Sequence, residues 1–179
     1  MATNYTSTGA SAMTAGRIVS VTSVIYQGVD SNNTTAFVIV GAGESDQLQV
    51  TTPTPQSSSS KFHIQCTIGI CSGSATTAFR IYRGGSVVAG LNGTGASTRI
   101  GVAFRMAGST SHTDNNHSAG SSFSVVDSPG SASASVYSIR FFNQVSSTSY
   151  IGSSVSDGDV AASYGSRTSS SLTVMEIAG

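Results

Sequence analysis

The sequence predicts an all-β fold, an antiparallel β-sandwich formed by a single domain over residues 17–179, with a flexible N-terminal arm over residues 1–16. Apolar residues recur with a period of two along many short segments, turn-forming residues separate these segments at short intervals, and helical periodicity is absent. Many short strands with closely spaced turns are typical of a sandwich or a barrel. Residues 1–16 are small, polar and without periodicity, so we expect them to be disordered alone or ordered by a neighbouring protein.

The composition indicates a folded chain rather than a disordered one. Charged residues make up only 9 % of the 179 residues, against about 25 % in ordinary soluble proteins. Disordered chains combine few apolar residues with a high net charge, whereas this chain is 38 % hydrophobic and has a formal net charge of zero. The chain is also long enough to bury a core of its own.

The distribution of charge and hydropathy excludes two classes of partner. The seven arginines and Lys61 are scattered along the chain and form no basic cluster of the kind that binds phosphates, so we expect no nucleic acid. No segment approaches the roughly 20 apolar residues of a membrane span, so we expect no membrane partner. The N-terminus also lacks the basic and apolar regions of a secretion signal, which predicts assembly in the cytoplasm.

The clearest strand covers residues 61–71, where five apolar residues alternate with polar or small ones: Phe62, Ile64, Cys66, Ile68 and Ile70. Residues 99–106 repeat the pattern, with Ile100, Val102, Phe104 and Met106 on one face. Further strands are expected at residues 18–26, 35–41, 47–52, 77–83, 86–90, 122–127, 135–145, 149–155 and 171–177. The dipeptide Gly84-Gly85 predicts a tight hairpin, and the polar residues 109–121 predict an exposed loop without strands.

Cys66 and Cys71 are predicted to be reduced thiols. If both lie in one extended strand, five residues at ~3.3 Å each place them ~16 Å apart. A disulfide tolerates a Cα separation of only ~7 Å, so the two residues cannot form a bridge within that strand. We expect Cys66 to be buried as a small hydrophobic residue.

Two predicted strands carry apolar groups on both faces, although a sandwich strand needs only one buried face. Phe142 lies on the face opposite Tyr137, Ile139 and Phe141. In the last strand, Met175 and Ile177 oppose Leu172 and Val174. We expect the second face to pack against other copies of the chain in a closed oligomer, which would also cover exposed sheet edges.

Four segments resemble a family of bacteriophage tail-fibre and capsid-surface modules. They are TPTPQSSSSK at residues 52–61, IYRGGS at 81–86, VVDSPGSASASVY at 125–137 and SSLTVMEIA at 170–178. Each is similar to a motif of that family: Pro-x-Ser-Ser-Lys, Leu-x-Arg-Gly-x-Thr, Leu-Asp-Ser-Pro…Thr-Tyr and a Leu-Thr-Met-Glu-Ile ending. Their order and spacing cover most of residues 17–179.

The resemblance implies a jelly-roll-like sandwich that assembles as a homotrimer on a virion, and it brings no catalytic residues. The motif residues Arg83, Asp127, Pro129 and Glu176 are interpreted as structural. Asp127 can accept hydrogen bonds from backbone amides in an Asx-type turn, and Pro129 presets the backbone of that turn. We hypothesise that Arg83 forms an ion pair with Asp127 or Glu176 and so locks the ends of the sandwich.

No enzyme is predicted. The chain has no Gly-x-Ser-x-Gly nucleophile elbow, and its eight acidic residues include only two close pairs, both in turn-like sequence. His112, Asp114 and His117 are residue types that bind a transition metal, and near a threefold axis one of these histidines from each copy could share an ion. We favour an exposed polar loop with two ordinary histidines, and predict neither metal nor cofactor.

Two functions remain. The favoured one is a capsid decoration protein on the virion surface, assembled in the bacterial host cytoplasm, whose arm residues contact the major capsid protein or another virion protein: Asn4, Tyr5, Met13 and Arg17. The alternative is a tail-fibre or spike tip that binds a host receptor, including a surface glycan. We expect decoration because the Met-initiated chain has only a short arm and no fibre shaft before the sandwich. Three arms on one trimer would bind with high effective concentration.

Overall fold

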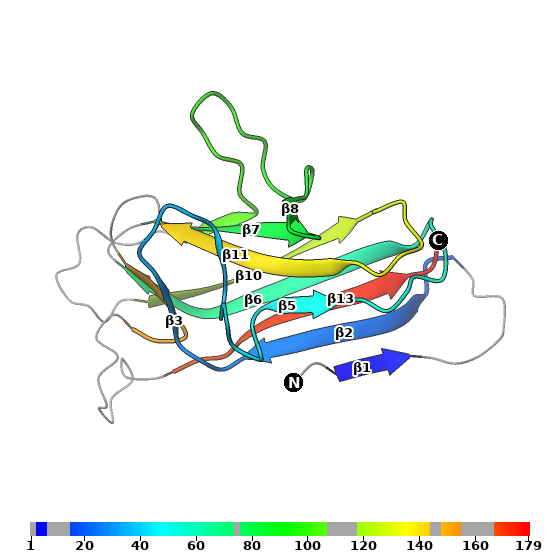
Figure 1. Ribbon diagram of the computed structural model, residues 1–179, viewed down its shortest axis with the longest axis horizontal. Coiled ribbons are helices and arrows are strands. Elements are labelled where there is room, and N and C mark those ends of the chain that lie inside the picture. Colours follow the sequence, from blue (N-terminus) through cyan, green and yellow to red (C-terminus); the bar gives the residue numbers. More distant parts are fainter. Residues whose placement is uncertain (1–2, 7–14, 74–75, 107–117, 144–147, 155–166) are drawn as a thin grey trace.

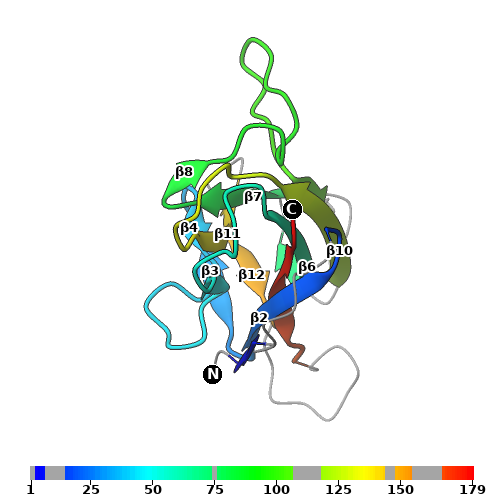
Figure 2. The same cartoon turned by 90° about the vertical axis from the view of Figure 1, so that its right-hand side faces the viewer.

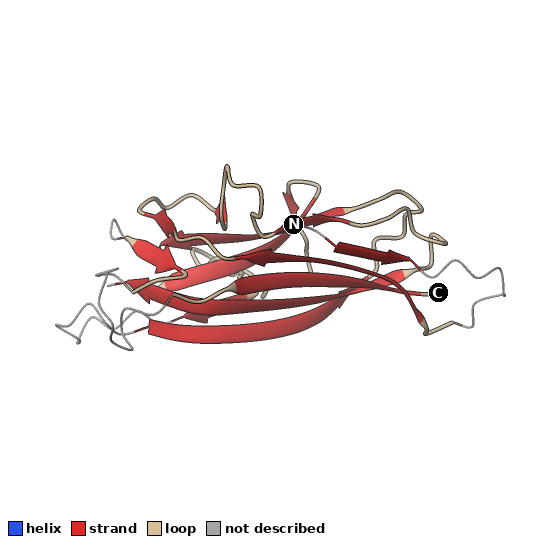
Figure 3. Cartoon of the chain, turned by 90° about the horizontal axis from the view of Figure 1, so that it is seen from below, coloured by secondary structure: helices blue, strands red, loops and turns tan. Residues whose placement is uncertain are grey.

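Strands supply all the regular structure in the part of the chain that the structure describes (Figure 3). The computed structural model describes residues 3–6, 15–73, 76–106, 118–143, 148–154 and 167–179. The strands are β1 (Thr3–Thr6), β2 (Ile18–Tyr26), β3 (Asp30–Asn32), β4 (Val38–Ile39), β5 (Gln49–Thr51), β6 (Lys61–Gly73), β7 (Thr77–Arg83), β8 (Ser86–Val87), β9 (Phe104–Met106), β10 (Ser118–Asp127), β11 (Val136–Asn143), β12 (Ser149–Ile151) and β13 (Ser170–Ile177). Within these residues no helix is long and apolar enough to cross a membrane.

The strands form two antiparallel sheets that pack on one another (Figures 1 and 2). In sheet A, β13 lies between β2 and β6, β1 pairs with β2, and β10 pairs with the other side of β6. The far end of β6 pairs with β12, which carries β3. In sheet B, the central pair is β7 and β11, with β4 and β5 on the free side of β11 and β8 and β9 on the free side of β7. The predicted all-β, antiparallel sandwich character is confirmed.

The core lies between the two sheets, because alternate residues of each strand face inward. Leu172 and Val174 of β13 face into it from sheet A, and Ile139 and Phe141 of β11 from sheet B. The largest fully buried side chains come from both sheets: Tyr26, Leu48, Phe62, Ile64, Ile68, Phe79, Ile81, Tyr137, Ile139, Phe141, Ile151 and Leu172. Fully burying one such side chain stabilises the fold by about 1.5–3 kcal/mol, so these residues are the main source of stability.

Three of the predicted strands have the predicted bounds or nearly so. β2 and β7 match the expected segments 18–26 and 77–83, and β6 extends the expected 61–71 by two residues. The predicted hairpin after β7 is also present. Gly84 and Gly85 both have positive φ, at 56° and 83°, which glycine adopts without the steric cost that a side chain would add.

The expected strand over residues 99–106 is largely wrong. Only Phe104–Met106 pairs with β7, and Ile100, expected on the buried face, is 48 % exposed. Residues 88–103 instead form a loop that projects beyond β7 and β8 (Figure 1). The Asn92 side chain holds the base of this loop. Its amide oxygen accepts a hydrogen bond from the Ile81 N–H and its amide nitrogen donates one to the Ile81 C=O, so the side chain takes the place of a neighbouring strand there. The alternation of apolar and polar residues therefore predicted a strand in a segment that, before Phe104, has no neighbouring strand to pair with.

Three segments that were not predicted as strands form strands in the structure. β10 begins at Ser118, inside the segment 109–121 that was expected to be a strand-free loop. Thr3–Thr6, inside the predicted flexible arm, is a strand antiparallel to β2 of its own chain. Asp30–Asn32 forms a short strand that was not predicted. These three segments are mainly polar, so hydrophobic periodicity carried no signal for them.

Cys66 is free and buried in the core, as predicted. Burial raises the pKa of its thiol, since the thiolate loses its hydration in the apolar core. We therefore expect a Cys71→Ser variant, which leaves Cys66 as the one thiol, to react with a thiol reagent only after denaturation. Labelling with the reagent in native buffer and in denaturant measures this directly. Fast labelling of the native variant would contradict the buried position.

Candidate functional site

Five side chains from the two sheets meet at one end of the sandwich. We call them the end cluster: Phe62, Arg83, Asp127, Tyr137 and Glu176. Asp127 ends β10 and Arg83 ends β7, so their ion pair joins sheet A to sheet B. The same Asp127 oxygen accepts a hydrogen bond of 2.7 Å from the Tyr137 hydroxyl of β11. Two donors of sheet B thus hold one carboxylate of sheet A.

The predicted pair of Arg83 with Asp127 is present, but the predicted role of Asp127 in its turn is not. Among the described residues, its hydrogen-bond partners are the Arg83 and Tyr137 side chains rather than backbone amides. The turn is formed without it, since Pro129 fixes its own φ and Gly130 follows with φ of 64°. Asp127 is 6 % exposed and faces the core, which directs it across to the other sheet.

Tyr137 is a part of this cluster that the sequence did not identify. Burial raises the pKa of its phenol, and the hydrogen bond and charge of Asp127 raise it further. The phenol therefore stays protonated and donates to the carboxylate at any pH near neutrality. Its ring also contacts the Phe62 ring, with centroids 5.8 Å apart, so one side chain serves both the core and the polar link.

Glu176 is a second buried carboxyl group in the end cluster, with an exposed fraction of 2 %. It accepts hydrogen bonds from the Gln56 backbone N–H at 2.7 Å, the Ser60 hydroxyl at 2.8 Å and the Ser20 hydroxyl at 3.2 Å. The alternative hypothesis that Arg83 pairs with Glu176 is therefore wrong. Glu176 instead fixes the loop of residues 52–60 and β2 against the last strand.

The end cluster and its hydrogen-bond partners bring together the four segments that carry the family resemblance, since Glu176 accepts from Gln56 and Ser60 of the first segment. Strand pairing places Phe62 between Asp127 of β10 and Glu176 of β13, in one row across sheet A. Arg83 pairs with Tyr137 in sheet B, in the layer that faces this row. The motif residues therefore act as a structural lock, and the hydrogen bonds within it account for the acidic residues of both motifs.

The outer face of sheet A carries an apolar patch, which we call the outer patch: Ile18, Val21, Val126, Met175 and Ile177. Register places Val126, His63, Met175 and Val21 in one row, and Ile177 beside Ile18 in the next. Val126 is 50 % exposed and Ile18 is 56 % exposed. Exposed apolar groups that share one face mark an interaction surface more often than isolated ones do.

The two apolar second faces predicted from sequence have different outcomes. Phe142 is buried by its own chain, because the Phe37 ring lies over it with centroids 4.5 Å apart. Met175 and Ile177 remain half-buried on the outer face of sheet A. Of the two faces, only the second thus remains partly exposed.

The predicted partner-binding residues lie in different environments. Register places Asn4 opposite Thr22 and Tyr5 opposite Val21, along the edge of sheet A. Arg17 is exposed, and its carbonyl accepts a hydrogen bond from the Ala178 backbone N–H. Met13 lies outside the described residues.

The metal-ligand candidates His112, Asp114 and His117 also lie outside the described residues. Within the described ranges, no group of three or more His, Cys, Asp or Glu side chains is arranged to hold a metal ion. Comparison with models of known protein families, and with curated proteins, returned no match for this chain.

Proposed function

We propose that the chain is a structural protein of a bacteriophage virion, a capsid decoration protein with a jelly-roll fold. The observation that carries the proposal is the nested order of strand pairs. β7 pairs with β9, β6 with β10, β5 with β11 and β2 with β13, so the chain is paired like one long hairpin folded over itself. This nesting supports a jelly roll, an architecture common among viral capsid and lectin domains.

The end cluster also supports the proposal, because it links the segments that carry the family resemblance. Four segments that are far apart in the sequence resemble motifs of phage surface modules, and they meet in one lock. Because every charged group in this lock is used within the fold, the motifs are structural rather than catalytic. A binding role at the virion surface fits such residues better than an enzymatic role.

The proposed assembly is a homotrimer in which the outer patch of each subunit is covered by another copy. The patch is apolar and lies on regular strands, which hold its side chains in fixed positions. Charges that would oppose association are few, since Lys61 is the one formally charged residue among its described rows. Closed cyclic symmetry would cover the patch on every subunit equally.

The substitution Val126→Lys is expected to dissociate the trimer. A lysine in a buried interface would leave an unpaired charge in an apolar contact, which costs several kcal/mol. Sedimentation velocity should show the wild-type protein as a trimer and the variant as a monomer with unchanged circular dichroism. Ser122→Lys is the control, because it adds the same charge to the exposed face of the same strand outside the patch. A trimeric Val126→Lys variant would contradict this interface.

Capsid binding tests the decoration role. Purified protein, intact or lacking residues 1–16, is mixed with undecorated capsids and the bound copies are counted after sedimentation. We expect stoichiometric binding by the intact protein and weak binding by the truncated one, since the arm supplies part of the contact. The melting temperature of the truncated protein is the control, because the deletion also removes β1. Adsorption to host cells without capsid binding would favour the alternative, a receptor-binding tip.

A further inference from the structure

Two arginines lie side by side on the outer face of sheet B, on strands separate from the outer patch of sheet A. Arg80 of β7 is directly opposite Arg140 of β11, and their sequence neighbours Phe79, Ile81 and Phe141 point into the core. Directly opposite residues on antiparallel strands have Cβ atoms ~5 Å apart, and like charges at that separation repel. The pair therefore costs stability unless an anion lies against it.

Aromatic rings hold both guanidinium groups in place. The Arg80 Cζ lies 4.4 Å from the centroid of the Phe37 ring, and the Arg140 Cζ lies 4.3 Å from that of Tyr82. Stacking on a ring fixes the plane of a guanidinium and leaves its N–H edge free to bind a carboxylate or phosphate with two parallel hydrogen bonds.

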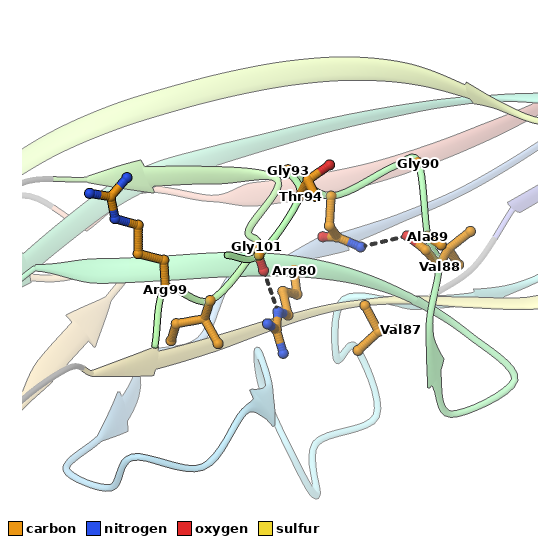
Figure 4. Close-up of a pocket in the computed structure, with 12 residues that line it drawn as sticks. Arg80, Val87, Val88, Ala89, Gly90, Gly93, Thr94, Arg99 and Gly101 are labelled. Carbon is orange, nitrogen blue, oxygen red and sulfur yellow. Dashed lines mark hydrogen bonds between the residues drawn. The ribbon is translucent and has the colours of Figure 1, made fainter. Parts of the chain in front are cut away.

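The hydrogen bonds of this pair leave donors unused. Arg80 Nε donates to the Gly101 carbonyl of the projecting loop at 2.6 Å (Figure 4). Arg140 Nε is buried and has no hydrogen-bond partner among the described residues. A buried donor without a partner costs about 1–3 kcal/mol, so Arg140 is held in this position at a cost to stability.

No described acid neutralises the pair. Asp127 and Glu176 are engaged in the end cluster, and the Asp30 carboxyl group accepts from the Ser31 and Gly41 backbone amides. Within the described ranges, no ion pair joins Arg80 or Arg140 to an acid. Arg105 adds positive charge, because it lies opposite Ala78 on the neighbouring strand.

A pocket of about 370 Å³ opens beside Arg80, between β8 and the base of the projecting loop (Figure 4). Its lining combines the Arg80 guanidinium with the polar side chains of Asn92 and Thr94 and the apolar side chains of Val87 and Ile100. Val87 and Ile100 are 43 % and 48 % exposed, so apolar surface lies free next to a fixed cation. Such a surface suits a small ligand with an anionic group, hydroxyls and an apolar face, as an acidic sugar has.

We propose that this face, the arginine site formed by Arg80, Arg140 and the adjoining pocket, binds the carboxylate or phosphate group of an acidic saccharide. The guanidinium pair binds the anion, and the pocket accepts the sugar ring. The site does not depend on the proposed assembly, because it lies on sheet B and the outer patch lies on sheet A.

Titration of the full-length protein with glucuronate, glucose 6-phosphate, inorganic phosphate and glucose, followed by NMR chemical shifts, tests the proposal. We expect saturable shifts around Arg80 and Asn92 with one or both acidic sugars, weaker shifts with phosphate and none with glucose. The preferred acidic sugar identifies the anion. Binding of phosphate as tight as that of the acidic sugars, or no saturable binding, would overturn the proposal.

Two variants locate the site. Arg80→Gln and Arg140→Gln should each weaken binding about tenfold or more, because each removes charge-assisted hydrogen bonds. Arg167→Gln removes the same charge from an exposed position just before β13 of sheet A and should leave the affinity unchanged. Melting curves of all three variants check the fold. Equal affinity of the two arginine variants and the wild type would overturn the assignment, and it would leave the capsid-binding test unaffected.

Discussion

Replacing Asp127 by alanine is expected to destabilise the protein by about 3 kcal/mol, because it leaves a part-buried guanidinium and a buried phenol without their shared partner. This corresponds to a fall in the melting temperature of roughly 6–12 °C for a domain of this size. The Arg83 guanidinium is partly exposed. Most of the loss therefore comes from the buried hydrogen bond between the Tyr137 hydroxyl and the Asp127 carboxylate. Thermal or urea unfolding at a fixed protein concentration measures the change.

Two further variants separate the contributions around Asp127. Tyr137→Phe removes one donor and keeps the ion pair, so it should cost only about 1 kcal/mol. Asp46→Ala is the charge-matched control, since the Asp46 carboxyl group accepts from the exposed Gln27 backbone N–H and lies outside the end cluster. If Asp127→Ala and Asp46→Ala unfold at the same denaturant concentration, the link between the sheets contributes nothing.

The second large effect is expected at Glu176. Glu176→Ala removes the acceptor of three hydrogen bonds and leaves a cavity beside Phe62, for a loss of about 3 kcal/mol. Glu176→Gln keeps the oxygen that accepts from Gln56 and Ser60, and its amide can donate to the Ser20 hydroxyl. We therefore expect the glutamine variant to lose less than about 1 kcal/mol.

The comparison of the two Glu176 variants distinguishes hydrogen bonding from charge. Equal losses for alanine and glutamine would show that the negative charge, rather than the hydrogen-bond acceptor, stabilises this part of the fold. Chemical denaturation with fluorescence of the tyrosines provides the free energies, since the chain contains no tryptophan.

The sequence predicted the bounds of two strands correctly. Residues 18–26 and 77–83 have the predicted bounds, since each pairs from end to end with one neighbouring strand, β13 and β11 respectively. Residues 99–106 have the same alternation, but most of them belong to the projecting loop. Alternation records which residues are apolar, and it contains no information on whether another strand is available to pair.

Some contacts of the candidate site could be predicted from the sequence, and others could not. The Arg83–Asp127 ion pair could be predicted, because the two residues have opposite charges and both lie in segments that resemble motifs of the phage family. The partners of Glu176 did not, because serine hydroxyls and a backbone N–H are donors that no charge pattern distinguishes. The pairing of Arg80 with Arg140 depends on the register of β7 and β11, which no sequence pattern of either strand fixes.

We propose that three copies of the chain cover the outer patches of one another. Light scattering coupled to size-exclusion chromatography, over a broad range of protein concentration, measures the mass in solution directly. A trimer of the 18.0 kDa chain, about 54 kDa, is the expected result. A monomer at every concentration would contradict the proposed trimer, since the outer patch would then be exposed to water.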